Sequence, residues 1–167
     1  DNYGYRTGIN ATMTNHVRMV ANEAAKLVRL KKDEAVLDIA SNDGTLLNFY
    51  KKNIFTVGAD PLAKKYKKYY KNFNCRIENF FSLKAIKKKK IDKKFKIITA
   101  LSMFYDLSDP NQFLIDIKKV LHKDGVFILE HADLLSILRN CQFDTICHEH
   151  LEYYSSKIIT ELTKENQ

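Results

Sequence analysis

The chain has 167 residues, of which 45% are hydrophobic and 29% are charged, so it has room for about one domain with a packed core. This composition excludes wholesale disorder, and no run of 18 apolar residues is present that could span a membrane. The net charge is +8, but 23 of the 28 cations are Lys. Since nucleic-acid readers favour Arg, we do not expect nucleic acid as a partner.

Short β-type runs alternate with helical patterns along the chain. Strands are predicted over 35–40, 55–60, 75–79, 95–101 and 125–131. Helices are predicted over 12–29, 45–52, 61–73, 110–121 and 133–140, whereas 84–94 is too charged to assign. This alternation predicts an α/β fold, a Rossmann-like doubly wound sheet that is mostly parallel, with helices on both faces.

Two of these helices show clear apolar stripes. In the first, the inward positions are Met13, Val17, Val20, Ala24 and Leu27. In the helix over 110–121, they are Phe113, Ile117, Val120 and Leu121. We expect both stripes to pack on the sheet.

The cysteines and the chain ends bear on the setting of the protein. Cys75, Cys141 and Cys147 are too few and too irregularly spaced for a disulfide framework, so we interpret them as reduced thiols of a cytoplasmic protein. The polar N-terminus shows no signal-peptide pattern. Both ends lie close to dense motifs, so we expect a single domain over 1–167 that is part of a longer protein.

A polar turn between the first strand and the following helical pattern is the strongest local signal. It contains Ala40, Ser41, Asn42, Asp43 and Gly44, and ligands of such folds bind at the carboxyl ends of strands. The turn lacks the G-x-G-x-x-G and P-loop spacings that hold phosphates, and it carries a carboxylate. It therefore suits S-adenosylmethionine, which has no phosphate but bears two cationic groups. The alternative is a plain turn and helix cap.

The ends of the next two strands extend this prediction. Asp60 follows Asp38 by 22 residues and precedes Pro61, and a carboxylate there can accept both hydroxyls of a ribose. After the third strand, Asn79 could read the edge of an adenine and Phe80 could pack on its face. A polar turn with core aromatics is the alternative for that pair.

With these motifs the sequence resembles class I S-adenosylmethionine-dependent methyltransferases, and more narrowly the C-methyltransferases of nucleotide-linked keto-deoxysugars. The resemblance lies in the stretches 2–10, 38–47, 102–110 and 143–155. It implies S-adenosylmethionine as cofactor, with Tyr3, Ser102, Met103 and Tyr105 added to its contacts. Family members usually have a zinc domain before this region and an α/β domain after it.

The resemblance also implies catalytic residues. His150 would be the base that makes an enolate from the ketone, and Glu149 would be a partner to a substrate hydroxyl or proton. Tyr5 would close over the cofactor as part of an N-terminal lid over 1–30. The chain departs from the family at Ala40, where a glycine is usual, and at Cys147, where some relatives have Tyr.

Two further motifs have alternative interpretations. The run Cys147-His148-Glu149-His150 could bind a metal or be a polar loop, but C-x2-C pairs are absent and we predict no metal. Residues 64–96 carry 14 cations against two acids. Cations and aromatics interleave over 64–71, which can bind single-stranded nucleic acid. Because the aromatics share one helical stripe, we predict core tyrosines with a solvated lysine face.

The sequence therefore predicts C-methylation of a nucleotide-linked keto-deoxysugar or a similar small ketone. The alternatives are an RNA methyltransferase that uses the basic segment, or a cofactor-binding fragment without activity. We expect a small-molecule substrate, no membrane partner and a monomer.

Overall fold

The computed structural model describes residues 4–71 and 73–166. Its centre is a five-stranded sheet in the order β3-β2-β1-β4-β5, in which every pair of neighbours is parallel. The strands are β1 (Ala35–Ile39), β2 (Phe55–Ala59), β3 (Cys75–Ile77), β4 (Phe95–Leu101) and β5 (Leu121–Glu130). This confirms the predicted α/β class and the five strands.

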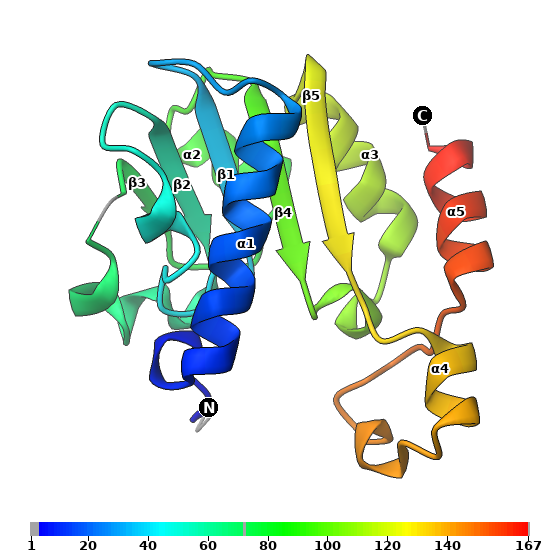
Figure 1. Ribbon diagram of the computed structural model, residues 1–167. Coiled ribbons are helices and arrows are strands. Elements are labelled where there is room, and N and C mark those ends of the chain that lie inside the picture. Colours follow the sequence, from blue (N-terminus) through cyan, green and yellow to red (C-terminus); the bar gives the residue numbers. More distant parts are fainter. Residues whose placement is uncertain (1–3, 72, 167) are drawn as a thin grey trace.

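Helices cover both faces of the sheet, as Figure 1 shows. Helix α1 (Ala11–Leu27) packs on one face, where Val17, Ala21 and Ala24 meet alternate residues of the strands. Helices α2 (Leu83–Lys88) and α3 (Pro110–Val120) pack on the other face, against the residues of opposite alternation. The remaining helices are α4 (Leu134–Arg139) and α5 (Ser156–Glu165).

Several boundaries differ from the prediction. The helices expected over 45–52 and 61–73 are wrong: the first contains only the 3-10 turn Leu47–Phe49, and the second contains the 3-10 turns Pro61–Lys64 and Lys67–Tyr69. Each loop instead buries apolar side chains, among them Leu47 and Ala63, in the same core cluster as α1, for which a regular helix is not needed. Helix α5 was not predicted.

One expected core position is also wrong. Leu27 is 70% exposed, because the buried stripe of α1 follows Ala21 and Ala24 to Val28 and leaves Leu27 on the outer side. Leu121 packs against the core as predicted, but as the first residue of β5, since α3 ends one residue earlier. The predicted strand over 125–131 thus begins earlier than expected.

Candidate cofactor and active site

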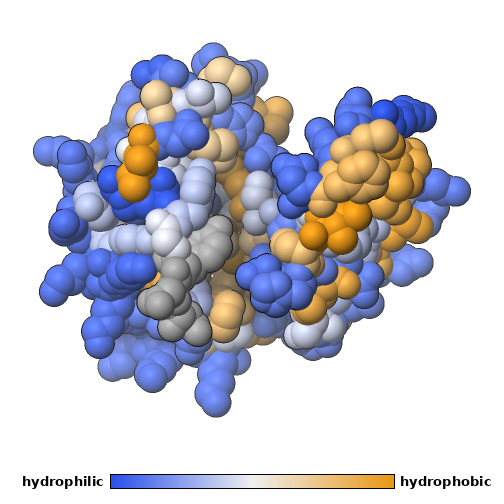
Figure 2. Space-filling model, turned by 90° about the horizontal axis from the view of Figure 1, so that it is seen from below, coloured by the Kyte–Doolittle hydropathy of each residue, from blue (hydrophilic) through white to orange (hydrophobic). Residues whose placement is uncertain are grey.

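A cavity of about 600 Å³ opens at the carboxyl ends of β1, β2 and β4. This volume lies within the range of small-molecule sites. Figure 2 views the molecule from this side and shows a hollow between a largely hydrophilic part and the more apolar surface around α4. The cavity is therefore at the edge of the sheet where ligands of open parallel sheets bind.

Three residues at the cavity are held in a strained backbone conformation. Ala40, Asn42 and Ser102 line it with φ angles of 55°, 49° and 53°. These angles lie in the left-handed region, which is energetically unfavourable for residues other than glycine because their Cβ atom clashes with the backbone. Such strain concentrates at functional sites. Ala40, the predicted departure from glycine, therefore keeps the glycine-like conformation despite its methyl group.

The predicted turn is supported from below by Tyr70. Its hydroxyl donates to the carbonyl of Asn42 at 2.9 Å and lies 2.8 Å from the hydroxyl of Ser41. Gly44 has φ 74°, and a Cβ there would come within 2.6 Å of the Tyr70 ring. Gly44 does not line the cavity but allows the turn to close over this ring. The sequence predicted Tyr70 only as a core residue.

Asp60 lies at the end of β2 and lines the cavity, as does Pro61. Its carboxylate is buried and accepts the N–H of Asn42 at 2.8 Å and the N–H of Leu62 at 2.6 Å. Burial raises the pKa of Asp60, although these two hydrogen bonds oppose the shift. The two bonds go to different oxygens of the carboxylate, so each oxygen keeps a second lone pair for a ligand.

Asp38, which the sequence did not single out as a site residue, also lines the cavity. It is buried in the middle of the sheet, beside Gly58 and Thr99 in register, and accepts the hydroxyl of Thr99 at 2.6 Å. Burial raises its pKa to about 7 against the opposing Thr99 bond, and Asp60 adds to the rise. Its position inside an apolar strand was the signal that could have identified it.

Asp43 lies beneath the turn rather than in the cavity. Its side chain is fully buried and accepts the N–H of Gly8 at 3.0 Å. It also accepts the N–H of Thr45 at 3.1 Å and the hydroxyl of Thr45 at 2.6 Å. The guanidinium of Arg6 lies 3.4 Å away and packs over the ring of Tyr69 at 3.8 Å. Asp43 thus fastens the N-terminal segment to the turn.

The N-terminal segment reaches the cavity through Tyr5. Tyr5 and Thr7 line it, and the carbonyl of Tyr5 accepts the side-chain amide of Asn42 at 3.1 Å. The Thr7 N–H donates to the other end of that amide, the Asn42 oxygen, at 3.0 Å. The predicted contact of Tyr3 lies outside the described residues.

Of the two residues predicted to contact the adenine, only one lines the cavity. Phe80 lines the cavity and is 77% exposed, whereas Asn79 is exposed outside it and accepts the N–H of Phe80 at 2.8 Å. After β4, Ser102 and Met103 line the cavity, but Tyr105 does not.

The second predicted motif folds onto the same edge of the sheet. Glu149 lines the cavity and lies 3.3 Å from His148, whose side chain is 91% exposed. His150 is not among the residues that line the cavity; its ring packs against that of Tyr105, with 4.2 Å between centroids and 45° between the ring planes. Asp106 lines the cavity nearby, and desolvation by its neighbours raises its pKa, with His150 opposing and Glu149 adding to the rise. In the part of the chain that the structure describes, no group of three metal-ligating side chains is present.

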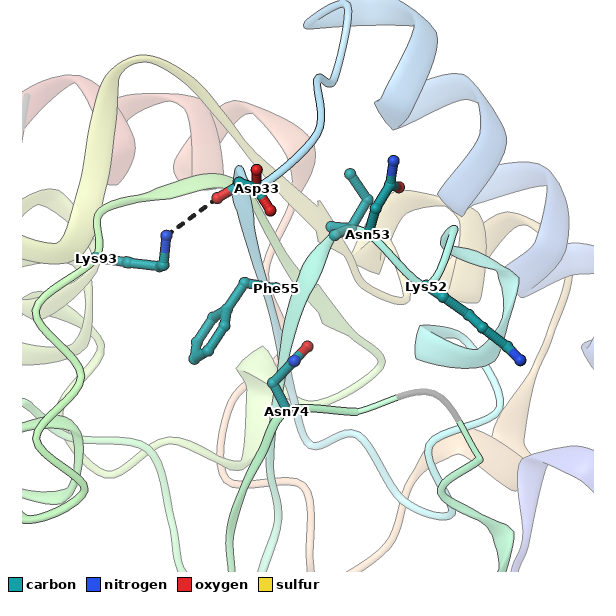
Figure 3. Close-up of a pocket in the computed structure, with 7 residues that line it drawn as sticks. Asp33, Lys52, Asn53, Phe55, Asn74 and Lys93 are labelled. Carbon is teal, nitrogen blue, oxygen red and sulfur yellow. Dashed lines mark hydrogen bonds between the residues drawn. The ribbon is translucent and has the colours of Figure 1, made fainter.

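A smaller pocket of about 140 Å³ lies at the opposite, amino ends of the strands. Figure 3 shows Lys93 directed toward the Asp33 carbonyl, to which it donates at 3.1 Å, while Lys52 points away. Thr56 N–H fixes the nearby Asn74 side chain at 2.8 Å. These side chains bond to the protein itself, so the larger cavity is the candidate site.

The aromatics of the lysine-rich stretch face inward. Tyr66 and Tyr70 are 7% and 4% exposed, whereas Lys64, Lys65, Lys67 and Lys68 are exposed. The predicted core role of these two tyrosines is confirmed, although Phe73 is 38% exposed. Buried tyrosines cannot stack on bases, so this observation does not favour nucleic acid. No helix within residues 4–71 and 73–166 is long and apolar enough to cross a membrane.

Comparison with known proteins decides the family. A profile described as "Methyltransferase domain" matches residues 13–167. The chain belongs to this methyltransferase family. S-adenosylmethionine is the methyl donor of the family, so the predicted enzyme class and cofactor are confirmed.

Individual relatives agree with this assignment. The chain is 24% identical over 163 residues to C-methyltransferase NovU of Streptomyces niveus. The alignment covers 92% of this chain but only 37% of NovU, so the chain spans little more than a third of that relative's length. The crystal structure of the plantazolicin methyltransferase BamL, bound to a triazolic desmethylPZN analogue and SAH, superposes with a TM-score of 0.70 at 14% identity, covering 94% of this chain and 63% of BamL. YcgJ of Bacillus subtilis gives 0.69 at 20% identity, covering 92% and 68% of the two chains.

The residues at the cavity fit the methyl donor. Buried carboxylates at Asp38 and Asp60 are suited to its cationic groups and ribose hydroxyls. The apolar walls from α1, the end of β4 and the loop after it are suited to its uncharged parts; they include Met13, Val17, Leu101, Met103 and Leu107.

Proposed function

We propose that the protein methylates a carbon atom of a small ketone, a nucleotide-linked keto-deoxysugar, through an enolate. The observation that carries the proposal is the position of Glu149 and His150 at the edge of the sheet that also bears the cavity. A relative that is itself a C-methyltransferase, although distant, supports the same reaction.

The cofactor contacts follow from the lining. Asp60 would accept the ribose hydroxyls through its remaining lone pairs, beside Pro61, Ala40, Ser41 and Asn42. When bound, S-adenosylmethionine supplies an electrophilic methyl group. Phe80 would cover the adenine side, while Asp43 and Gly44 act indirectly by shaping the turn.

The chain's own residues would prepare the carbon nucleophile. A proton next to a ketone is removed by a base with a pKa near the working pH, which histidine provides. His150 is the base in this proposal, and Glu149, which lines the cavity, binds a substrate hydroxyl. Tyr5 and Thr7 line the cavity from the N-terminal segment, and in this proposal the segment 1–30 acts as the lid.

The broader setting is part of the same proposal. We place the protein in the cytoplasm as a monomer, with residues 1–167 acting as the methyltransferase domain. A nucleotide-linked sugar is a small soluble substrate, so no membrane or nucleic-acid partner is required.

The base assignment is tested with His150→Ala in the full chain. We expect turnover and the exchange of the substrate α-proton with deuterium from solvent to fall by about 10²-fold or more. The binding of S-adenosylhomocysteine (SAH), the demethylated form of the methyl donor, should stay unchanged. His148→Ala is the matched control, since this side chain is 91% exposed. Undiminished exchange in His150→Ala would refute the base.

A further inference from the structure

Several side chains of the loop that carries His150 are exposed. The side chains of His148, Ile146 and Leu151 are all more than half exposed. The hydrogen bonds described for the Tyr153 hydroxyl stay within the loop: it accepts the N–H of Cys147 at 3.3 Å and donates to the carbonyl of Thr145 at 3.5 Å. The position of the imidazole therefore depends on what fastens this loop to the sheet.

The short 3-10 turn Phe104–Asp106 after β4 provides that fastening. The carbonyl of Tyr105 accepts the N–H of Leu151 at 2.9 Å and the N–H of Glu152 at 3.2 Å. One residue earlier, the ring of Phe104 packs on Tyr154 with 5.4 Å between centroids. Main-chain and side-chain contacts thus join this turn to the residues directly after His150.

The side chain of Tyr105 completes the arrangement. Its ring packs against the imidazole of His150, with 4.2 Å between centroids and the planes tilted by 45°, and its hydroxyl donates to the carbonyl of Ser102 at 2.9 Å. That bond holds the ring against the end of β4, where Ser102 lines the cavity in its strained conformation. Tyr105 itself is not among the residues that line the cavity.

We propose that Tyr105 is a positioning residue, which holds the His150 ring at the rim of the cavity and does not bind the cofactor. The inference rests on the proposed role of His150 for its effect on turnover, but not for the contact itself. It replaces the sequence-based prediction of a cofactor contact at Tyr105. The contact is between two rings, so Phe, which keeps the ring but lacks the hydroxyl bond to Ser102, should largely serve in its place, and an aliphatic side chain should not.

The test compares Tyr105→Leu and Tyr105→Phe in the full chain with ¹³C-labelled histidine. His150→Gln assigns the His150 ring signal in the NMR spectrum. The ring current of an aromatic ring 4.2 Å away displaces this signal, so we expect Tyr105→Leu to lose the displacement and Tyr105→Phe to keep it. Phe143→Leu, on the same loop and 72% exposed, is the matched control and should leave the signal unchanged.

Binding and turnover are measured on the same variants. With a nucleotide-linked keto-deoxysugar, Tyr105→Leu should lose about 10²-fold in kcat, as expected for a misplaced catalytic group, with KM and SAH affinity unchanged. Tyr105→Phe should restore most of the kcat. An unchanged His150 signal in Tyr105→Leu, or weakened SAH binding, would overturn the proposal. If His150→Ala alone keeps full turnover, the base assignment fails, while the NMR signal still decides the positioning.

Discussion

At the scale of single residues, the buried carboxylate of Asp38 has the most unusual chemistry. It lies in the middle of the sheet and its pKa is raised to about 7, mainly by burial. In an unfolded chain its pKa would be about 3.9. The folded protein therefore binds one more proton than the unfolded chain between these two values.

This difference predicts a pH-dependent effect of Asp38→Asn. Because the folded pKa is raised, the stabilising contribution of protonated Asp38 is complete below about pH 4 and is lost as the pH rises to 7, by up to about 1.4 kcal/mol per pH unit. Asn cannot ionise but can still accept the Thr99 hydroxyl. Relative to wild type, the variant should therefore gain free energy of unfolding between pH 5 and 7, measured by urea titration of the ligand-free protein.

A flat difference across this pH range would contradict the assignment. The same carboxylate should attract the cationic methyl donor, so Asp38→Asn should also weaken S-adenosylmethionine binding above pH 7. Asp116→Asn is the control, since this residue is buried but lies on α3, outside the cavity.

At the scale of elements, a single side chain closes the loop that carries His150. Asp133 caps α4 by accepting the N–H and hydroxyl of Ser136 at 3.0 and 3.1 Å. Its other oxygen accepts the N–H and hydroxyl of Ser156 at 2.8 and 2.9 Å, at the start of α5. These bonds lower the pKa of Asp133 to about 2, and the bonds to Ser156 have the largest effect.

We therefore expect Asp133→Ala to loosen both helix starts. Amide hydrogen exchange at Ser136 and Ser156 should become about tenfold faster, as expected for a lost helix cap, and turnover should fall without a loss of SAH affinity. Since its pKa is lowered, Asp133 contributes above about pH 4, and the contribution is lost as the pH falls through about 2. Asp144→Ala, in the same loop, should change neither rate; equal protection in Asp133→Ala would contradict the role.

The elements that the sequence predicted best are those with a single strong cause. The strands were found because apolar runs between turn residues leave few alternatives, and β1 is buried along its whole length. The helices over 45–52 and 61–73 were predicted from periodicity alone, but tertiary contacts such as that of Tyr70 with Gly44 favour compact turns. The segment 84–94 could not be assigned, yet the Ser82 cap and buried Ile86 suffice for α2.

At the scale of the whole molecule, the site combines segments far apart in the sequence. The turn 40–44, Asp60 and Glu149 were all predicted, because strand ends and motifs mark them locally. The contacts of Tyr105 with His150 and of Asp43 with Gly8 were not, since they join residues about 45 and 35 positions apart through the packing of loops. Local patterns predicted which residues matter, and the fold decides which of them contact the cavity.

The most direct test of the account is a crystal structure of the full chain bound to S-adenosylhomocysteine. We expect the ligand in the cavity at the ends of β1, β2 and β4, with its ribose hydroxyls on the carboxylate of Asp60 and its sulfur on the side of Glu149 and His150. A ligand bound elsewhere, or one that leaves Asp60 without a contact, would contradict the account.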